Sequence, residues 1–144
     1  MGFNEDLKEG QKIEDEMIMM LSNKDSIIIK APTNKQFYDY DFIIDDIKYE
    51  CKYDKLASKT DNICIEFECN NKPSGISTTQ SKYYIIKTND NIYKIKVKKI
   101  KKLINNNNFK IVNGGDGYRS KMYLINKSYF EKYIYKALNA STTL

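Results

Sequence analysis

The sequence predicts an α+β (α/β) domain in which helices flank a mixed central β-sheet. Apolar residues recur every three to four positions over residues 4–21, as in an amphipathic helix. The middle of the chain consists of short runs in which apolar and polar residues alternate, a pattern typical of strands. With 144 residues, the chain is long enough for one hydrophobic core, so we expect a single domain over residues 1–144.

The first element is predicted to be a helix from Asn4 to Leu21. Asn4 suits the N-cap position, because its side chain can accept a hydrogen bond from a free backbone N–H. Gly10 interrupts the helix and is expected to mark the close approach of another backbone segment. Glu14 lies one turn beyond Gly10, beside the apolar stripe. It is either one of several solvated acids on this helix or a functional carboxylate.

Residues 37–54 are predicted to form a hairpin of two short strands that turns at Asp45 and Asp46. Aspartate tolerates the left-handed backbone that a two-residue turn requires. This register places Asp41 directly opposite Glu50. Because side chains alternate along a strand, Asp41, Glu50 and Lys52 would share a polar face, and the other face would be apolar and aromatic.

Two carboxylates that face each other across a ladder have Cβ atoms roughly 5 Å apart and repel each other. Such a pair is stable with a cation between the two groups, and Mg²⁺ is commonly bound by one or two carboxylates together with water. Lys52 lies two residues beyond Glu50 on the same face, where its ammonium could contact a metal-bound water or a phosphate. The alternative is an ordinary solvated face of a sheet.

Several further elements follow from local patterns. We expect a buried strand over residues 26–31, a polar loop over 55–61, and a strand over 62–68. A second hairpin is predicted from residues 83–87 and 92–97, then a short basic helix over 98–104. A strand pair over 109–112 and 120–125 precedes a terminal helix over 128–138 and a tail over 139–144. The basic helix is either a contact for a nucleic-acid backbone or a solvated face.

The composition excludes several kinds of chemistry. The chain has three cysteines and no histidine, which argues against a disulfide framework, an ordinary zinc site and any histidine-dependent catalysis. Cys51 and Cys64 fall within predicted strands, where we expect buried, unreactive thiols. The net charge of +5 mildly favours binding to polyanions. No apolar run is long enough to span a membrane, and the acidic start is unlike a signal peptide, so we expect a cytoplasmic protein without a membrane partner.

A turn signal at Lys72 to Ile76 precedes Thr78 and Thr79. These threonines could cap a short helix whose free N–H groups, together with Lys72 and Ser74, would bind a phosphate. The alternative is a plain capped turn.

Two stretches resemble a known superfamily. Asp41 followed by Glu50-Cys51-Lys52 resembles the PD-(D/E)XK nuclease core of restriction-endonuclease-like proteins. The second stretch is similar to a group of phage and viral members, and it comprises Ile65-Glu66, Lys72 to Ile76, Thr78-Thr79 and Tyr83-Tyr84. Asp61 departs from the pattern, since such proteins tend to have glycine there.

The resemblance implies a restriction-endonuclease-like fold and a divalent-metal-dependent DNA endonuclease, selective for a structure such as a junction or flap. It implies that Mg²⁺ or Mn²⁺ is bound by Asp41, Glu50 and the backbone carbonyl of Cys51, and that Lys52 orients the attacking water. Glu14 and Glu66 would complete the carboxylate shell. DNA would be held by Lys72, Ser74, Thr78 and Thr79. A phage or viral member would act in the host cytoplasm, and a homodimer is one way to cut both strands.

Two other classes of function stay open at this point. One is a nucleic-acid-binding or host-interaction module that keeps the same fold without catalysis. The other is a purely structural protein. The facing acidic pair and Lys52 argue against the module, because a relative without catalysis would have no reason to retain a repelling pair of carboxylates.

Overall fold

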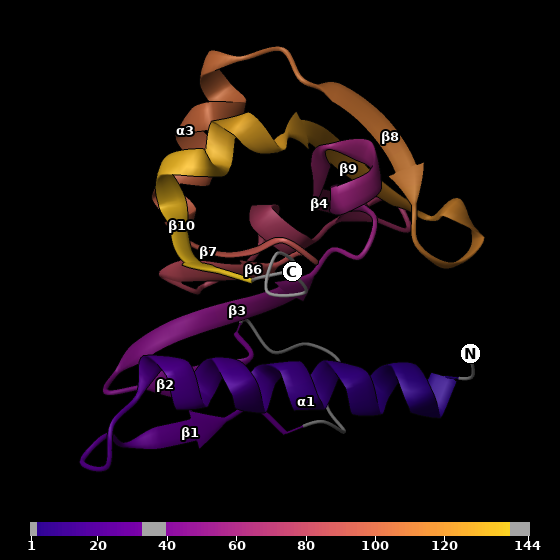
Figure 1. Cartoon of the computed structure of the whole chain (residues 1–144). Coiled ribbons are helices and arrows are strands. Elements are labelled where there is room, and N and C mark those ends of the chain that lie inside the picture. Colours follow the sequence, from indigo (N-terminus) through magenta and orange to yellow (C-terminus); the bar gives the residue numbers. More distant parts are fainter. Residues whose placement is uncertain (1–2, 33–39, 139–144) are drawn as a thin grey trace.

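The computed structural model describes residues 3–32 and 40–138. It contains two β-sheets that pack face to face, with a long N-terminal helix on the outer side of the first sheet (Figure 1). The predicted connector over residues 33–36, the start of the predicted hairpin at 37–39 and the tail over 139–144 lie outside the described residues.

The N-terminal helix α1 (Phe3–Leu21) confirms the prediction from the apolar stripe. It begins one residue before Asn4, so the predicted N-cap is wrong. Its buried residues Ile13, Met17 and Ile18 pack against the first sheet. Gly10 does not mark a close approach, because a Cβ placed there would meet no atom within 4 Å.

The first sheet has six strands and is mixed, as predicted. β3 pairs with β6 in parallel, and every other neighbouring pair within it is antiparallel. In spatial order the sheet comprises β1 (Ile28–Lys30), β2 (Phe42–Ile44), β3 (Ile47–Tyr53), β6 (Tyr83–Lys87), β7 (Asn91–Lys96) and β10 (Ile134–Ala137).

The β2–β3 hairpin turns at Asp45 and Asp46, whose φ angles of 49° and 69° confirm the left-handed turn. Its ladder pairs Phe42 with Tyr49 and Ile44 with Ile47, as the predicted register requires. The neighbouring strand β1 was expected to be buried and is not: Ile29 is 51% exposed. β1 is the edge strand of the sheet, so only one of its sides has a partner.

The second sheet has four antiparallel strands and covers the face of the first sheet opposite α1 (Figure 1). In spatial order it comprises β5 (Lys72–Pro73), β4 (Asn62–Cys69), β9 (Ser120–Asn126) and β8 (Lys110–Gly114). Side chains from both sheets and from helix α3 (Val97–Asn106) form one core, which includes Ile65, Tyr84, Ile100 and Ile125.

Short helical segments connect the strands. The predicted loop over residues 55–61 contains the four-residue helix α2 (Ala57–Thr60). The 3-10 helices are η1 (Gly75–Ser77), η2 (Asp116–Tyr118) and η3 (Lys127–Tyr133).

The predicted terminal helix over residues 128–138 is wrong in its second half. After η3 the chain extends into β10, which pairs with β7 at the edge of the first sheet. Ile134 and Tyr135 favour strand geometry, and pairing satisfies backbone groups that an edge strand would otherwise expose. Phe130 in η3 is fully buried in the core between the two sheets, and this burial holds η3 in place just before β10.

Cys51, Cys64 and Cys69 are all free thiols and are partly rather than fully buried. Within the described part of the chain, no helix is long and apolar enough to cross a membrane.

Candidate active site

The acidic pair predicted from the sequence, Asp41 and Glu50, lies where the start of β2 adjoins β3. Asp41 directly precedes β2, and its backbone N–H donates to the carbonyl of Tyr49 at 2.8 Å. Its own carbonyl accepts from the N–H of Ala31 at 2.9 Å. The ladder therefore stops at Phe42, and the prediction that Asp41 pairs directly with Glu50 in the ladder is wrong.

The Asp41 side chain nevertheless reaches β3. Its Oδ2 atom accepts a hydrogen bond from the backbone N–H of Cys51 at 2.7 Å. The N–H and C=O of one strand residue point to the same side of the strand, so the Cys51 carbonyl also faces the edge where Asp41 lies. This side-chain bond fixes the carboxylate at the point where regular pairing ends.

Glu50 and Lys52 extend from β3 on the face opposite α1, because they alternate with Cys51 and Tyr49, which pack on the helix side. Lys52 Nζ lies 3.5 Å from Glu50 Oε2. The Glu50 side chain is 16% exposed, whereas 45% of the Lys52 side chain remains exposed. A buried acid is thus paired with a lysine that solvent can reach.

Burial and the charges of the neighbouring groups shift the pKa values of Glu50 and Lys52. Burial raises the pKa of Glu50 to about 7 against the opposing effect of Lys52, and Asp41 adds to the increase through its charge and through a shared hydrogen bond. Burial alone would lower the pKa of Lys52, but the carboxylates of Glu50, Asp41 and Glu66 raise it above its ordinary value. Lys52 is therefore a charged hydrogen-bond donor at neutral pH.

Glu14 approaches from α1, on the other face of the first sheet. Burial and the charge of Asp41 raise the pKa of Glu14 to about 7, while Lys30 opposes the increase. Asp41 interacts electrostatically with both Glu14 and Glu50. The site therefore contains the carboxyl groups of Glu14 from α1, of Asp41 just before β2, and of Glu50 from β3.

Glu66 approaches from the second sheet, on β4. Its Oε2 atom accepts a hydrogen bond from Ser74 Oγ at 2.9 Å. Its charge acts on Lys52 and on the buried hydroxyl of Tyr84, whose pKa is raised by burial and then by Glu50, Glu66 and Asp41. Glu66 therefore lies on the lysine side of the site, while Glu14 lies on the helix side.

The donor set suits a hard divalent cation. Two carboxylates and a backbone carbonyl face one edge, and Mg²⁺ normally keeps several waters in addition to one or two carboxylates. Among residues 3–32 and 40–138, no group of three or more histidine, cysteine, aspartate or glutamate side chains is placed to hold a metal ion. A cation here would therefore depend on Asp41, Glu50, the Cys51 carbonyl and water.

The residues predicted to hold DNA do not form the expected phosphate cradle. Ser74 is bonded to Glu66, and Lys72 is exposed on the short strand β5. Thr78 and Thr79 follow the 3-10 helix η1 rather than starting a helix, and η1 is only three residues long. The glycine before Ile76 permits this tight turn, and the chain then enters β6 without forming a helix.

One hydrogen-bonded group beside the site, Asp54, was not identified from the sequence. Asp54, at the end of β3, accepts hydrogen bonds from the N–H groups of Leu56, Ala57 and Cys64, at 3.2, 3.1 and 3.0 Å. It joins β3 to β4 and thereby fixes the strand that carries Glu66. An aspartate just after a strand is a local signal for such a turn, but its partner on β4 is not visible in the sequence.

Comparisons with protein-family models and with curated proteins find no match for this chain. Asp41, Glu50 and Lys52, by their positions, burial and charges, are therefore the features of this chain that indicate a function.

Proposed function

We propose that this chain is a divalent-metal-dependent DNA endonuclease with a restriction-endonuclease-like, PD-(D/E)XK core. The observation that carries the proposal is the meeting of Asp41, Glu50 and Lys52 at the start of β2. Burial, and then the charge of Asp41, raise the pKa of Glu50, and the charged Lys52 lies 3.5 Å from Glu50 on β3. The mixed sheet with α1 on its outer face is compatible with such a core.

Asp41, Glu50 and the Cys51 carbonyl would hold Mg²⁺ or Mn²⁺. When bound, the ion would polarise a phosphoryl oxygen and lower the pKa of a coordinated water. Asp41 is held in place for this role by the N–H of Cys51. A bound cation would favour the ionised form of Glu50, whose pKa is raised mainly by burial and then by Asp41.

Lys52 would act as a charged donor rather than as a base. Its raised pKa keeps the ammonium protonated at neutral pH. It would orient the attacking water and stabilise the negative charge that develops on the phosphate. The side chain also lines a largely apolar pocket of about 550 Å³ between β3 and β4, which gives a substrate group access to the ammonium.

Glu14 and Glu66 would extend the site on its two sides. Glu14 lies within the electrostatic range of Asp41, so it could bind a metal-coordinated water. Glu66 is oriented by Ser74, and it acts on Lys52. We assign both as supporting carboxylates, which hold water or orient Lys52.

Cleavage of supercoiled plasmid and of synthetic junctions and flaps tests this proposal. We expect cleavage in Mg²⁺ or Mn²⁺ and none in EDTA. Asp41→Ala and Lys52→Ala should each lower the rate by about 10²- to 10³-fold. Lys121→Ala is the matched control, since Lys121 is also paired with a glutamate on a strand, at 3.3 Å from Glu68. Metal-independent cleavage, or full activity of both site variants, would exclude the mechanism.

The second candidate is a nucleic-acid-binding or host-interaction module on the same fold. It is favoured because no group of three or more histidine, cysteine, aspartate or glutamate side chains among the described residues is placed to hold a metal ion. Calorimetric titration with Mn²⁺ separates the two functions. Binding that Asp41→Asn removes supports the nuclease, and no binding at millimolar Mn²⁺ supports the module.

The proposal also covers where and how the enzyme would act. It would work on DNA in the cytoplasm, of the host if the protein is viral, and a homodimer would let it cut both strands. Light scattering with and without a DNA junction measures the second point, because a dimer has twice the mass of the 16.9 kDa chain.

A further inference from the structure

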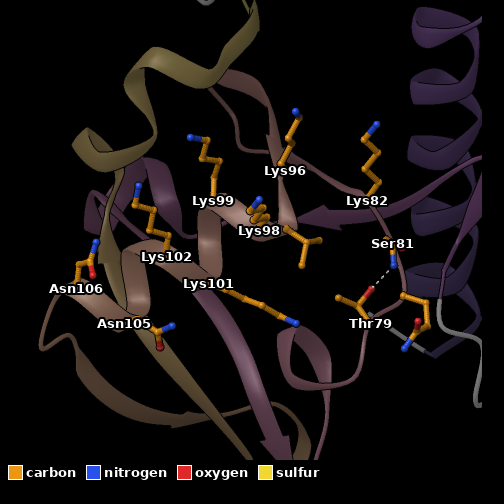
Figure 2. A pocket seen from close by; sticks show the side chains of 12 residues that line it. Thr79, Ser81, Lys82, Lys96, Lys98, Lys99, Lys101, Lys102, Asn105 and Asn106 are labelled. Carbon is orange, nitrogen blue, oxygen red and sulfur yellow. Dashed lines mark hydrogen bonds between the residues drawn. The ribbon is translucent and has the colours of Figure 1, made fainter.

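A basic pocket lies between helix α3 and the start of β6, apart from the carboxylates of the candidate active site. Its volume is about 940 Å³. One wall is the segment from Thr79 to Lys82, and the other is the end of β7 with α3 (Figure 2). The lysines that line it are Lys82, Lys96, Lys98, Lys99, Lys101 and Lys102.

The charge of this pocket is not balanced by the protein. No aspartate or glutamate is among its lining residues. None of the six lysines forms a salt bridge with another described residue, whereas Lys30, Lys52, Lys87 and Lys121 each pair with a carboxylate. All six are exposed, so their charges are available to a ligand. A polyanion is the ligand class that such a surface attracts.

Helix α3 holds these lysines in a fixed arrangement. Val97 and Ile100 are buried in the core shared by the two sheets, which fixes the orientation of the helix. Lys98, Lys101 and Lys102 are spaced three and four residues apart and so share one side of it. The ordered backbone of α3 places the positive charges before a ligand binds, which lowers the entropic cost of binding.

The pocket is connected to the candidate active site through the first sheet. Lys82 donates its backbone N–H to the Lys48 carbonyl at 2.9 Å and accepts from the N–H of Val97 at 2.9 Å. Two residues further along β6, Tyr84 pairs with Glu50. A step of two strand residues covers roughly 7 Å. The pocket and the candidate active site are therefore close to each other along neighbouring strands of this sheet.

The lining residues indicate which part of a nucleic acid would bind. They are lysines, small polar residues and the amides of Asn105 and Asn106, with Val97 as the apolar member. Single-stranded binding sites stack bases on aromatic side chains, and the lining contains none. Lysines and amides instead suit phosphate oxygens, which fix position without reading sequence.

We propose that this pocket binds the phosphate backbone of a DNA duplex that flanks the bond to be cut. The inference rests on the proposed nuclease function, and it assigns DNA binding to α3 and the segment from Thr79 to Lys82 instead of to Lys72, Ser74 and Thr78. The contacts are with phosphates, so affinity should depend strongly on salt and little on sequence.

The test measures binding of a fluorescently labelled 20-base-pair duplex by anisotropy, in EDTA so that no cleavage occurs, over a series of salt concentrations. The test variant is Lys98→Gln/Lys101→Gln/Lys102→Gln, since glutamine keeps the helix propensity of lysine. The matched control is Lys24→Gln/Lys110→Gln/Lys136→Gln, which removes the same charge from exposed lysines that do not line the pocket.

If each of the three α3 lysines contacts one phosphate, the slope of log affinity against log salt should become shallower by about 2.7. Affinity at low salt should fall by at least about tenfold, and the control should differ little from the wild type. Equal slopes and affinities for the two triple variants would overturn the proposal, because only net charge would then matter. The binding assay in EDTA tests this inference, and the cleavage assay tests the nuclease proposal. Loss of cleavage in Lys52→Ala with normal DNA binding would leave the inference about the pocket intact, so failure of either proposal can be told from failure of the other.

Discussion

Replacing Glu50 by glutamine should stabilise the protein in the absence of metal. The pKa of this acid is raised from 4.5 to about 7, so the folded state binds the proton more tightly than the unfolded chain. The resulting cost is absent below pH 4.5 and fully present above pH 7. It amounts to at most about 3 kcal/mol. Glutamine resembles the protonated acid and removes this cost, and we expect a gain of about 1–3 kcal/mol at pH 8.

Thermal unfolding in EDTA, followed by circular dichroism at pH 8 and pH 4, measures this gain. A change of 1 kcal/mol corresponds to about 3 °C in a domain of this size, so Tm should rise by about 3–9 °C at pH 8 and change little at pH 4. Glu68→Gln is the matched control, because Glu68 also lies on a strand and is paired with Lys121. Loss of that partly exposed ion pair should cost less than about 1 kcal/mol.

The same variant should lose its response to metal. A ligand present at ten times its Kd stabilises the folded state by about 1.4 kcal/mol. Mg²⁺ or Mn²⁺ should therefore raise the Tm of the wild type and of Glu68→Gln, but not that of Glu50→Gln. The reasoning is refuted if Glu50→Gln is less stable than the wild type in EDTA at pH 8, since the carboxylate would then be well accommodated without a cation.

Three further predictions concern the surroundings of the site. Gly75→Ala should destabilise the protein by about 2 kcal/mol or more in urea unfolding, because φ of Gly75 is +53° and a Cβ would overlap the Glu66 carbonyl oxygen. Gly10→Ala should instead stabilise the protein by up to about 1 kcal/mol. Equal effects of the two substitutions would contradict this placement of the turn. Glu14→Gln should gain about 1 kcal/mol over the wild type as the pH rises from 5 to 8, after allowance for solvent screening, and a difference independent of pH would refute the raised pKa. Ser74→Ala should lower the free energy of unfolding by about 1 kcal/mol, because its hydrogen bond to Glu66 is lost. A double-mutant cycle with Glu66→Gln measures the coupling between the two side chains, and a coupling of zero would show that they do not interact.

Local patterns in the sequence are sufficient for most of the elements. The stripe of Ile13 and Met17 identifies α1, and the Asp45-Asp46 turn sets the register of the β2–β3 hairpin. Each of these features depends on residues that are neighbours in the chain or that lie on one face of one element.

Long-range features could not be obtained in the same way. The helical pattern over residues 128–138 ends at Tyr133 because β7 offers an unpaired edge to Ile134 and Tyr135, and no local signal reveals that edge. At Asp41, where the β2–β3 ladder ends, the carbonyl accepts from the N–H of Ala31, ten residues earlier in the chain, and no local signal predicts this contact. Pairing in the sheet thus overrides local propensity at both places.

The candidate site was predicted in its members and only partly in its geometry. Asp41, Glu50 and Lys52 do meet, although Asp41 reaches β3 through its side chain rather than as a ladder partner. The basic run of α3 was visible in the sequence, but its alignment with Lys82 required the parallel β3–β6 pair and the β6–β7 hairpin. Such a surface assembles only when separate elements pack together.

The most direct test of the central claim is the anomalous scattering of crystals of this protein soaked in Mn²⁺. The account predicts a peak about 2.1 Å from one carboxylate oxygen of Asp41 and one of Glu50, and its loss in crystals of Asp41→Asn. A Mn²⁺ peak bound elsewhere, or no peak between these two side chains at millimolar Mn²⁺, would contradict the account.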